Sequence, residues 1–343
     1  MRGLTNIIIP AIEINDELLK CLTEINKINF SNFFVSILLD RKSKRKIPKF
    51  KYKLNKLVVG KINMSKKRNI AAKKFKSEYI AFIDSDAYPN RNWLKLAIKY
   101  LKQKKGDVVG GPGLPFPQQS DSERICYYSK RSFFVTGYLN FRKFKAKKRY
   151  CDWLESCNLI MTRSFFLKYG GMDNKRYTGE DKEFFERVRK INPELKVYYS
   201  PNLFIYHRER QLTGFLLQRM CFGMDFLNLV KPSSGIKGFQ PALPILIFLT
   251  MSVILISEIN LIVKSEILII SIIMINFAIF FNIMSYIKSF KDLILTMITI
   301  NFANISFALG GILTFLGLKK ILVNKVYTYS RQRKISEYSR TSG

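Results

Sequence analysis

The last third of the chain is a succession of long apolar segments, and they limit the folds that the chain can adopt. Ile267 to Ile287 contains no charged residue, and Leu293 to Leu318 is similarly long and uncharged, although it includes polar Asn301 and the Gly310-Gly311 pair. Roughly 20 apolar residues suffice to cross a bilayer. Ala242 to Ser257 is shorter and would be a tilted span. We therefore expect two or three membrane helices, with a bundle of buried core helices as the alternative.

The charge balance points in the same direction. The 343 residues include 58 Lys and Arg against 25 Asp and Glu, a formal net charge of +33. Such a field attracts anionic lipids, phosphate groups and nucleic acid. No zinc finger, helix-turn-helix or RNP-type strand is evident, so a membrane is the expected partner and nucleic acid is not. The five cysteines form no Cys-x-x-Cys pair, which predicts neither a zinc site nor a disulfide framework.

Two carboxylates follow a short apolar run in the first half of the chain. Tyr79 to Ile83 is rich in aromatic and β-branched residues, which predicts a buried strand, and Asp84 and Asp86 come directly after it. In open α/β sheets ligands collect beyond the strand ends. Two carboxylates at such an edge are typical of a site for a divalent cation. A turn that closes the strand is the alternative, because Asp-Ser-Asp is also good turn chemistry.

A second acidic cluster lies almost a hundred residues further on. Glu180 and Asp181 begin a segment in which Phe184, Phe185 and Val188 would share one face of a helix. Carboxylates in the first turn of a helix are favoured by its dipole, so ordinary capping is the alternative. The cluster indicates a functional site only if it faces the first one.

A series of short motifs extends over about the first 230 residues, and each is weakly specific by itself. They are Ile7–Glu13, Leu38–Asp40, Met64–Asn69, Tyr79–Asp86, Val108–Pro112, Ser156–Leu159, Gly170–Asp173 and Tyr177–Asp181. Their order and spacing resemble the family-two glycosyltransferases, and the apolar C-terminal part resembles relatives that make exopolysaccharides of the succinoglycan type. The resemblance implies an α/β GT-A fold, with a Rossmann-like mixed sheet, followed by C-terminal transmembrane helices.

The resemblance also implies roles for the matching residues. Asp84 and Asp86 would hold Mg²⁺ or Mn²⁺ against the diphosphate of a nucleotide-sugar, with His207 as a third ligand, and Asp181 would be the catalytic base. The implied nucleotide-sugar site comprises Pro10, Glu13, Asp40, Arg68, Asp84, Arg208, Arg210 and Gln211. The implied acceptor side comprises Asn158, Gly179 and Glu180.

Some of these positions depart from the usual pattern of the family. Asp40 is followed by Arg41-Lys42-Ser43 instead of a second acid and a glycine, and Glu13 stands where a Tyr-Asn pair is more usual, so the nucleotide base is not predicted. The alternative to a metal-ligand role for His207, the only histidine, is a surface or nucleotide-side position. The arginines near it suit binding of a phosphate group, and the alternative is that they form a solvated basic face.

We predict three parts of the chain. Residues 1–235 would form the catalytic GT-A domain, 236–320 a hydrophobic membrane region of two or three helices, and 321–343 a basic tail. The first boundary is placed near Lys231 to Gly235, where Pro and Gly interrupt a helix-like stretch.

The predicted function is transfer of one sugar, with inversion, from a UDP- or GDP-sugar to a membrane-presented acceptor. A polyprenyl-diphosphate-linked glycan, in surface polysaccharide or glycoprotein glycan synthesis, is the acceptor that we favour. The alternatives are a polyprenyl-phosphate sugar synthase and, from another class, a membrane-tethered basic binding protein with an inactive transferase fold. Processive synthesis is disfavoured because a Gln-x-x-Arg-Trp motif is absent and the only tryptophans are Trp93 and Trp153.

The expected location is the cytoplasmic membrane, in a multi-pass arrangement with the catalytic domain facing the cytosol. The chain enters its first predicted strand almost at once, without the pattern of a secretory signal. Three spans would put the basic tail outside, against the positive-inside tendency, whereas Lys288 and Lys291 fit a cytosolic turn. We therefore expect two spans and a cytosolic C-terminus, with Leu293–Leu318 as a re-entrant or surface-lying hairpin.

Overall fold

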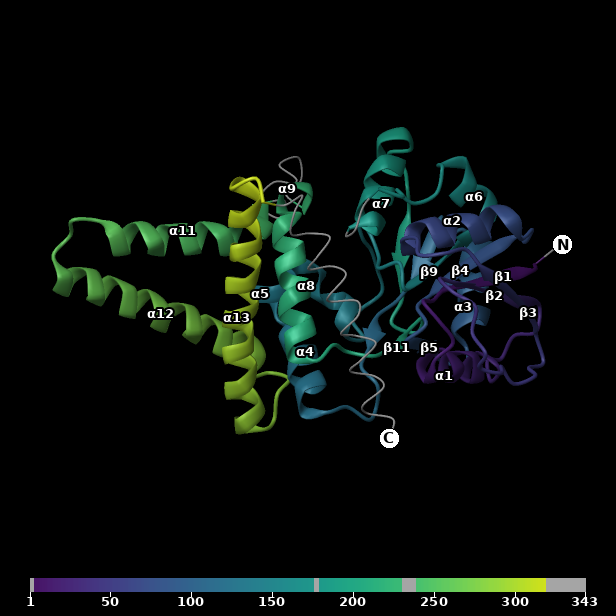
Figure 1. Ribbon diagram of the computed structural model, residues 1–343, viewed down its shortest axis with the longest axis horizontal. Coiled ribbons are helices and arrows are strands. Elements are labelled where there is room, and N and C mark those ends of the chain that lie inside the picture. The colour runs from purple at the N-terminus through teal and green to yellow at the C-terminus, as the bar shows by residue number, and fades with distance from the viewer. Residues whose placement is uncertain (1–2, 176–178, 230–238, 319–343) are drawn as a thin grey trace. The chain divides into compact units, whose positions relative to one another are not determined.

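The computed structural model describes the whole chain except residues 1–2, 176–178, 230–238 and 319–343 (Figure 1). It divides into two compact units, between which the chain passes three times. The first unit comprises Met1–Phe116 and Phe141–Arg208, and the second comprises Pro117–Asn140 and Glu209–Gly343. The predicted boundary after residue 235 and the basic tail lie outside the described residues, and both stay predictions.

The first unit is built on a mixed sheet of eight strands in the order β3-β2-β1-β4-β9-β6-β10-β8. The strands are β1 (Thr5–Pro10), β2 (Phe33–Leu39), β3 (Lys53–Val58), β4 (Tyr79–Ile83), β6 (Val108–Gly110), β8 (Arg149–Tyr150), β9 (Asn158–Thr162) and β10 (Val197–Tyr199). Strands β3, β2, β1 and β4 are parallel, and β9 is antiparallel to both β4 and β6. Every residue of β1, β2 and β4 is buried, which explains their continuous apolar runs. The predicted α/β fold with a mixed sheet is confirmed.

Helices complete the core of the first unit. They are α1 (Asp16–Ile25), α2 (Met64–Lys74), α3 (Trp93–Lys102), α6 (Arg163–Lys168) and α7 (Glu180–Ile191). The side chains of Asn15 and Asn63 cap α1 and α2 by accepting hydrogen bonds from Leu18 N and Lys66 N. The helix predicted at Glu180 is α7, and the residues predicted for its inner face, Phe184, Phe185 and Val188, are buried. The carboxylates at its start are therefore held on a firmly packed helix.

A small second sheet positions the only histidine. Its order is β5 (Ala87–Pro89), β11 (Ile205–His207), β7 (Gly113–Leu114). Strand β11 is antiparallel to β5, with His207 opposite Ala87, and Arg208 N donates a hydrogen bond to Asp86 O at 3.0 Å. Because Ala87 directly follows Asp86, this register brings His207 to the two carboxylates from about 120 residues away in sequence.

The second unit is helical. Its elements include α4 (Asp121–Arg131), α5 (Phe133–Thr136), α8 (Leu212–Met224), α9 (Phe226–Leu229), the 3₁₀ helix η3 (Gln240–Ala242), α11 (Leu243–Ile256), α12 (Leu261–Ile283) and α13 (Phe290–Phe315), and η1 (Gly137–Lys143) spans the boundary between the units. Helices α8 and α13 approach closely because they meet at glycines: a Cβ on Gly223 would lie 1.9 Å from Phe307 O, and one on Gly310 would lie 2.1 Å from Met220 O.

Two of the apolar helices, α12 and α13, are long and apolar enough to cross a membrane by length and composition, whereas α11 is a shorter apolar helix. The hairpin expected within Leu293–Leu318 is wrong, because α13 is one continuous helix through Phe315. Its Gly310-Gly311 pair does not break the helix, since both glycines accept close neighbours: Met220 O at Gly310, and Ile245 at Gly311. Length and composition alone do not decide which helices cross.

Gly110 in β6 provides a test of this packing. A Cβ there would lie 2.3 Å from Asn158 O in β9, whereas a Cβ on Gly113 would have its nearest neighbour, His207 Cβ, at 3.8 Å. We expect Gly110→Ala to force the two strands apart and to lower the thermal midpoint of the full chain in detergent by roughly 5 °C. Gly113→Ala is the matched control and should change it much less. Equal midpoints for the two variants would contradict the close approach of β6 and β9.

Candidate active site

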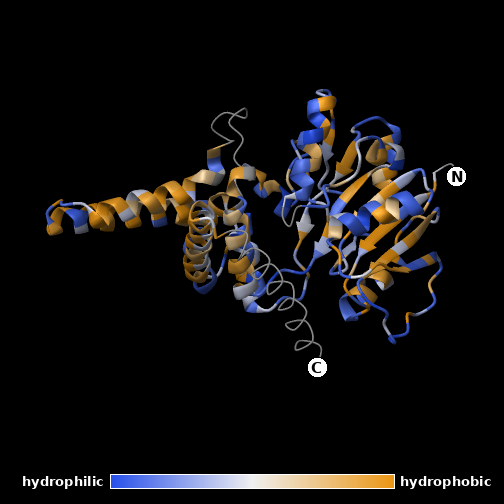
Figure 2. Ribbon diagram, turned by 45° about the horizontal axis from the view of Figure 1, so that its top comes forward, coloured by the Kyte–Doolittle hydropathy of each residue, from blue (hydrophilic) through white to orange (hydrophobic). Residues whose placement is uncertain are grey.

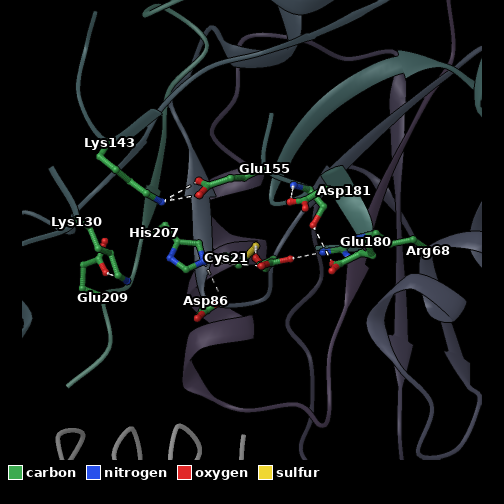
Figure 3. A network of polar contacts seen from close by, with 12 residues as sticks. Cys21, Arg68, Asp86, Lys130, Lys143, Glu155, Glu180, Asp181, His207 and Glu209 are labelled. Carbon is green, nitrogen blue, oxygen red and sulfur yellow. Dashed lines mark hydrogen bonds and ion pairs between the residues drawn. The ribbon is translucent and has the colours of Figure 1, made fainter. Parts of the chain in front are cut away.

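The carboxylates that follow β4 converge with His207. Asp84 Oδ1 accepts a hydrogen bond from Arg68 Nη2 at 2.7 Å, and Asp84 Oδ2 lies 3.8 Å from His207 Nε2. Asp86 Oδ1 lies 3.7 Å from the same nitrogen, and its side chain is buried. Figure 3 shows the imidazole of His207 between Asp86 and Glu155. The two carboxylates and the imidazole therefore lie close together, as a shared site requires.

Arg68, on the buried face of α2, joins the two acidic clusters. Its side chain is only 2% exposed. While Nη2 bonds Asp84, Nη1 lies 3.5 Å from Glu180 Oε1 at the start of α7 (Figure 3). The sequence indicated a functional site only if the second acidic cluster faced the first. The structure shows that it does, across one buried guanidinium.

The start of α7 is more than an ordinary cap. Its N-cap, Gly179, has a φ of 69° and no side chain to offer. Ser156 N donates to Asp181 Oδ2 at 3.2 Å, and Ser156 Oγ donates to Glu180 Oε1 at 3.4 Å. Both carboxylates are therefore directed at the loop before β9, although Asp181 Oδ1 also accepts from Lys182 N at 2.8 Å. The helix positions these acids and the loop orients them.

The two acidic clusters have opposite electrostatic environments. Burial and the neighbouring charge of Glu180 raise the pKa of Asp181 to about 7, although Arg142 opposes this. Burial acts in the same direction on Asp84, but His207 and Arg68 hold the pKa of that carboxyl below its ordinary value. Asp84 is thus a permanent anion, whereas Asp181 changes protonation near neutral pH. Pairs of acids whose pKa values are pushed apart are typical of active sites.

Glu155 is a residue of this region that the sequence reasoning missed. It accepts two hydrogen bonds from Lys143 Nζ, at 2.8 and 2.9 Å, and lies 3.9 Å from Arg142 Nη2. Burial would raise its pKa, but the two cations lower it to about 2. Glu155 directly precedes Ser156, so this ion pair anchors the loop that contacts Asp181. Its place beside the Ser156–Leu159 motif was the only sequence signal.

The residues of the first motifs gather at the carboxyl ends of β1 and β2. Pro10 ends β1, and Asp40 follows β2 directly. The buried ammonium of Lys67 pairs with Asp40 and also donates to Ala11 O. Glu13 is paired with Arg41, whose Nε lies 3.1 Å from Glu13 Oε2. This edge is where ligands bind in open α/β sheets, and the nucleotide-binding roles stay predictions.

The basic residues that follow His207 are divided between the units. Arg208 belongs to the first unit and pairs with Glu17 of α1. Arg210 and Gln211 belong to the second unit, in which Gln211 Nε2 donates to Ser120 Oγ at 3.1 Å. Only Arg208 is therefore placed in the unit that carries the acidic clusters.

Asn158 is held by protein groups on every side. Its Oδ1 accepts from Trp93 Nε1 at 2.8 Å, and its Nδ2 donates to Gly111 O at 3.0 Å and to Leu203 O at 2.7 Å. The residue is 2% exposed. These bonds describe a side chain that ties β9 to its surroundings, and the acceptor-side role of Asn158 stays a prediction.

The residues around His207 fit a divalent cation. Asp84, Cys157 and His207 each offer one ligand atom, and these atoms lie within 4.8 Å of one another. Asp86 approaches the same imidazole. The carboxylate oxygens suit Mg²⁺ or Mn²⁺, and the imidazole nitrogen is a softer donor that transition-metal ions accept more readily than Mg²⁺ does. Cys157 was not among the predicted ligands, and the proximity of its thiol follows from its place between Ser156 and Asn158.

Comparison with known proteins bears on the family and the fold. Residues 6–167 match the family described as Glycosyl transferase family 2. The chain is similar to a solved mannosyltransferase, PcManGT from Pyrobaculum calidifontis, in complex with GDP-Man and Mn²⁺, with 12% identity, a TM-score of 0.59 and coverage of 92% of this chain and 88% of that one. At this identity the likeness shows the fold, which is GT-A. No curated protein matches the chain.

Two further structures are similar over shorter parts of their own length. One is S. aureus TarS 1-349 in complex with UDP, with 16% identity, a TM-score of 0.45 and coverage of 66% of each chain. The other is GalNAc-T7 with UDP, GalNAc and Mn²⁺, with 12% identity, a TM-score of 0.46 and coverage of 60% of this chain and 43% of that one. The chain thus spans less than two thirds of these relatives.

Asn158 can be tested as a structural residue or an acceptor ligand. We expect Asn158→Ala to lower the thermal midpoint of the full chain by roughly 5–10 °C, because it leaves the Trp93 N–H and two backbone carbonyls without their partner. Trp93→Phe removes only one of these bonds and should have a smaller effect. An Asn158→Ala variant that melts like the wild type but transfers no sugar would show instead that the amide acts on the acceptor.

Proposed function

Residues 6–167 form a glycosyl transferase family 2 domain, which makes the chain a glycosyltransferase, and on this premise we propose a specific reaction. The chain transfers one sugar, with inversion, from a nucleotide-diphosphate sugar to the hydroxyl of a membrane-presented acceptor. The observation that carries this proposal is the contact of Arg68 with both Asp84 and Glu180, which links a diphosphate-side carboxylate to the residue that directly precedes the candidate base, Asp181.

The donor would lie at the carboxylates that follow β4. Asp84, Asp86 and His207 would hold Mg²⁺ or Mn²⁺, which supplies positive charge to neutralise the departing diphosphate. Asp84 suits this task because its pKa is lowered, so it stays ionised over the working pH range. The GT-A fold shared with a mannosyltransferase solved with GDP-Man and Mn²⁺ supports a nucleotide-sugar donor. The nucleobase of the donor would be uracil or guanine.

Asp181 would act as the general base. Its carboxylate takes the proton of the acceptor hydroxyl while that oxygen forms a bond to the anomeric carbon. The bond from this carbon to the diphosphate oxygen breaks, and its electron pair leaves with the nucleoside diphosphate. Attack from the face opposite the leaving group inverts the anomeric centre. A base with a pKa of about 7 is well matched to this step near neutral pH.

The same pKa favours a hydroxyl acceptor over the bare lipid phosphate of a polyprenyl-phosphate sugar synthase. A phosphate acceptor is already ionised near neutral pH and requires no proton acceptor, whereas a hydroxyl does. Two helices that are long and apolar enough to cross a membrane support an acceptor presented there. We therefore propose a polyprenyl-diphosphate-linked glycan, used in surface polysaccharide or glycoprotein glycan synthesis, as the acceptor.

The metal assignment is tested by Asp84→Ala and Asp86→Ala. We expect each variant to lose Mn²⁺-dependent binding of UDP or GDP and to lose donor hydrolysis, because a ligand and a compensating charge are removed together. Calorimetry with nucleotide, in the presence and absence of Mn²⁺, measures binding independently of the acceptor. Asp152→Ala, at an exposed acid of the same unit, is the control. Turnover like that of the wild type in either variant, at saturating Mg²⁺ or Mn²⁺, would refute the assignment.

The base assignment is tested by Asp181→Asn together with a pH profile. Asn keeps the shape without the basicity, so we expect donor affinity to be retained and turnover to fall by about a hundredfold or more. Because only the ionised form accepts a proton, kcat/KM of the wild type should rise with pH through about 7. Below that pH the carboxyl is protonated, which stabilises the fold but stops the reaction.

Glu180→Gln adds a directional check on the same group. The charge of Glu180 raises the pKa of Asp181, so its removal should move the acidic limb of kcat/KM to lower pH. An unmoved limb would mean that another group is being titrated. Asp181→Asn with unchanged turnover at saturation and reduced nucleotide affinity would place Asp181 at the donor instead.

A further inference from the structure

Helices α11 and α12 expose apolar side chains over most of their length. Their buried residues lie at the ends nearest α13: Ile245 joins a cluster with Phe307 and Ala308, and Ile279 and Ile283 join a cluster with Ile300. Between these ends the surface is open, with Ile256 83% and Leu261 77% exposed. Figure 2 shows the two helices as a continuous apolar arm of the second unit.

We propose that α11 and α12 form a helical hairpin that crosses the bilayer, and that α13 lies along the membrane surface without crossing it. The occupant of the exposed surface is thus the hydrocarbon of a lipid bilayer. The inference concerns the second unit alone and is independent of the transfer reaction. Length and composition identify α12 and α13 as candidate spans, whereas the proposal assigns the two spans to α11 and α12.

The exposed apolar surface of α12 covers more than half of the helix. Its members are 37–62% exposed and include Ile267, Ile269, Ile270, Ile272, Ile273 and Met274. At 100° per residue these positions spread over roughly 220° of the helix surface, so docking of one face on another protein would still leave apolar side chains in water. Only 11% of the most apolar window of α12 is buried, compared with 44% for α13. A surrounding apolar solvent fits α12.

Helix α13 has a different pattern. Thr296, Ile300, Ala303 and Phe307 are buried on one face, whereas the large exposed apolar residues recur every three or four positions on another. These residues form one stripe along the helix: Phe290, Ile294, Ile298, Phe302, Ile305 and Leu309. A single apolar stripe with protein packed behind it is what a helix at a membrane surface presents.

One of the helices packed on α13, α4, is strongly charged. Arg124 Nε and Nη2 of α4 bond the carboxylate of Asp292 at 2.8 and 3.0 Å. Helix α4 also carries Asp121, Glu123, Lys130 and Arg131. If α13 crossed the membrane, helix α4 would be drawn towards the hydrocarbon with it, which is unfavourable for charged groups. Helices α11 and α12 carry no such neighbours along their exposed lengths.

Charges lie at the two ends of the proposed hairpin and are absent between them. Lys288 and Lys291 flank the turn after α12, whereas the tip carries Glu258, Lys264 and Glu266. The positive-inside tendency places the lysine end in the cytosol. At 1.5 Å per residue, α11 spans about 21 Å and the uncharged stretch 267–283 about 25 Å. Both are shorter than the ~30 Å hydrocarbon layer, so the bilayer would thin locally around them.

The tip is also suited to a polar environment. Lys264 Nζ donates to Leu255 O and Ser257 O, at 2.9 and 2.8 Å, and so satisfies carbonyls at the end of α11. A hairpin that stopped inside the hydrocarbon would bury this ammonium with two carboxylates nearby. Crossing to the far headgroup region avoids that cost.

Single cysteines at three exposed positions test the proposal on the full chain in intact cells. The variants are Glu258→Cys at the tip, Lys288→Cys at the base and Leu318→Cys just after α13. Mass spectrometry assigns the labelled site, so the five native cysteines are retained. We expect a membrane-impermeant maleimide to label only Glu258→Cys before permeabilisation, and all three variants after it.

Each other pattern overturns the proposal. Labelling of Lys288→Cys alone means that α12 and α13 cross, and labelling of both Glu258→Cys and Leu318→Cys means that all three helices cross. Labelling of Lys288→Cys and Leu318→Cys without Glu258→Cys reverses the orientation. If no variant is labelled before permeabilisation, the hairpin does not cross. Because labelling is independent of turnover, a failure here leaves the proposed reaction untouched.

Discussion

The buried guanidinium of Arg68 is the interaction on which the candidate site depends. A cation that is 2% exposed needs anionic partners, and Arg68 has one on each side: Asp84 after β4 and Glu180 at the start of α7. Removing either partner would leave an incompletely compensated buried charge, which is far more costly than losing a surface ion pair. The guanidinium therefore fixes the distance between two segments that are almost a hundred residues apart. A donor and a base can act together only if that distance is maintained.

The environment gives chemically identical groups different properties. The carboxyls of Glu155, Asp181 and Asp84 belong to one site but differ in pKa. Cations lower the pKa of Glu155 to about 2, whereas burial beside Glu180 raises the pKa of Asp181 to about 7. Asp84 is held below its ordinary value by His207 and Arg68. Glu155 is therefore an ionised anchor of its loop, and Asp84 is an anion on the diphosphate side. Only Asp181 is left able to exchange a proton near neutral pH.

Sequence patterns predicted the elements whose evidence is local. The apolar runs of β1, β2 and β4 and the inner face of α7 follow from burial on a strand or one side of a helix, and both were confirmed. The GT-A fold itself came from resemblance, because periodicity does not specify strand order. The bridge through Arg68 and the pairing of His207 opposite Ala87 join segments far apart in sequence, so no local pattern contains them. Glu155 was missed for the same reason.

Hydropathy likewise failed to separate two helices with different surroundings. Both α12 and α13 are long and apolar enough to qualify as spans by length and composition. The glycine pair of α13 suggested a break, but these glycines allow α8 and α11 to pack against an unbroken helix. What distinguishes the helices is their packing: α13 contacts α4, a helix with five charged groups, whereas most of α12 is exposed. Apolar composition shows that a helix tolerates hydrocarbon, and only its packing shows whether the rest of the fold permits it to enter.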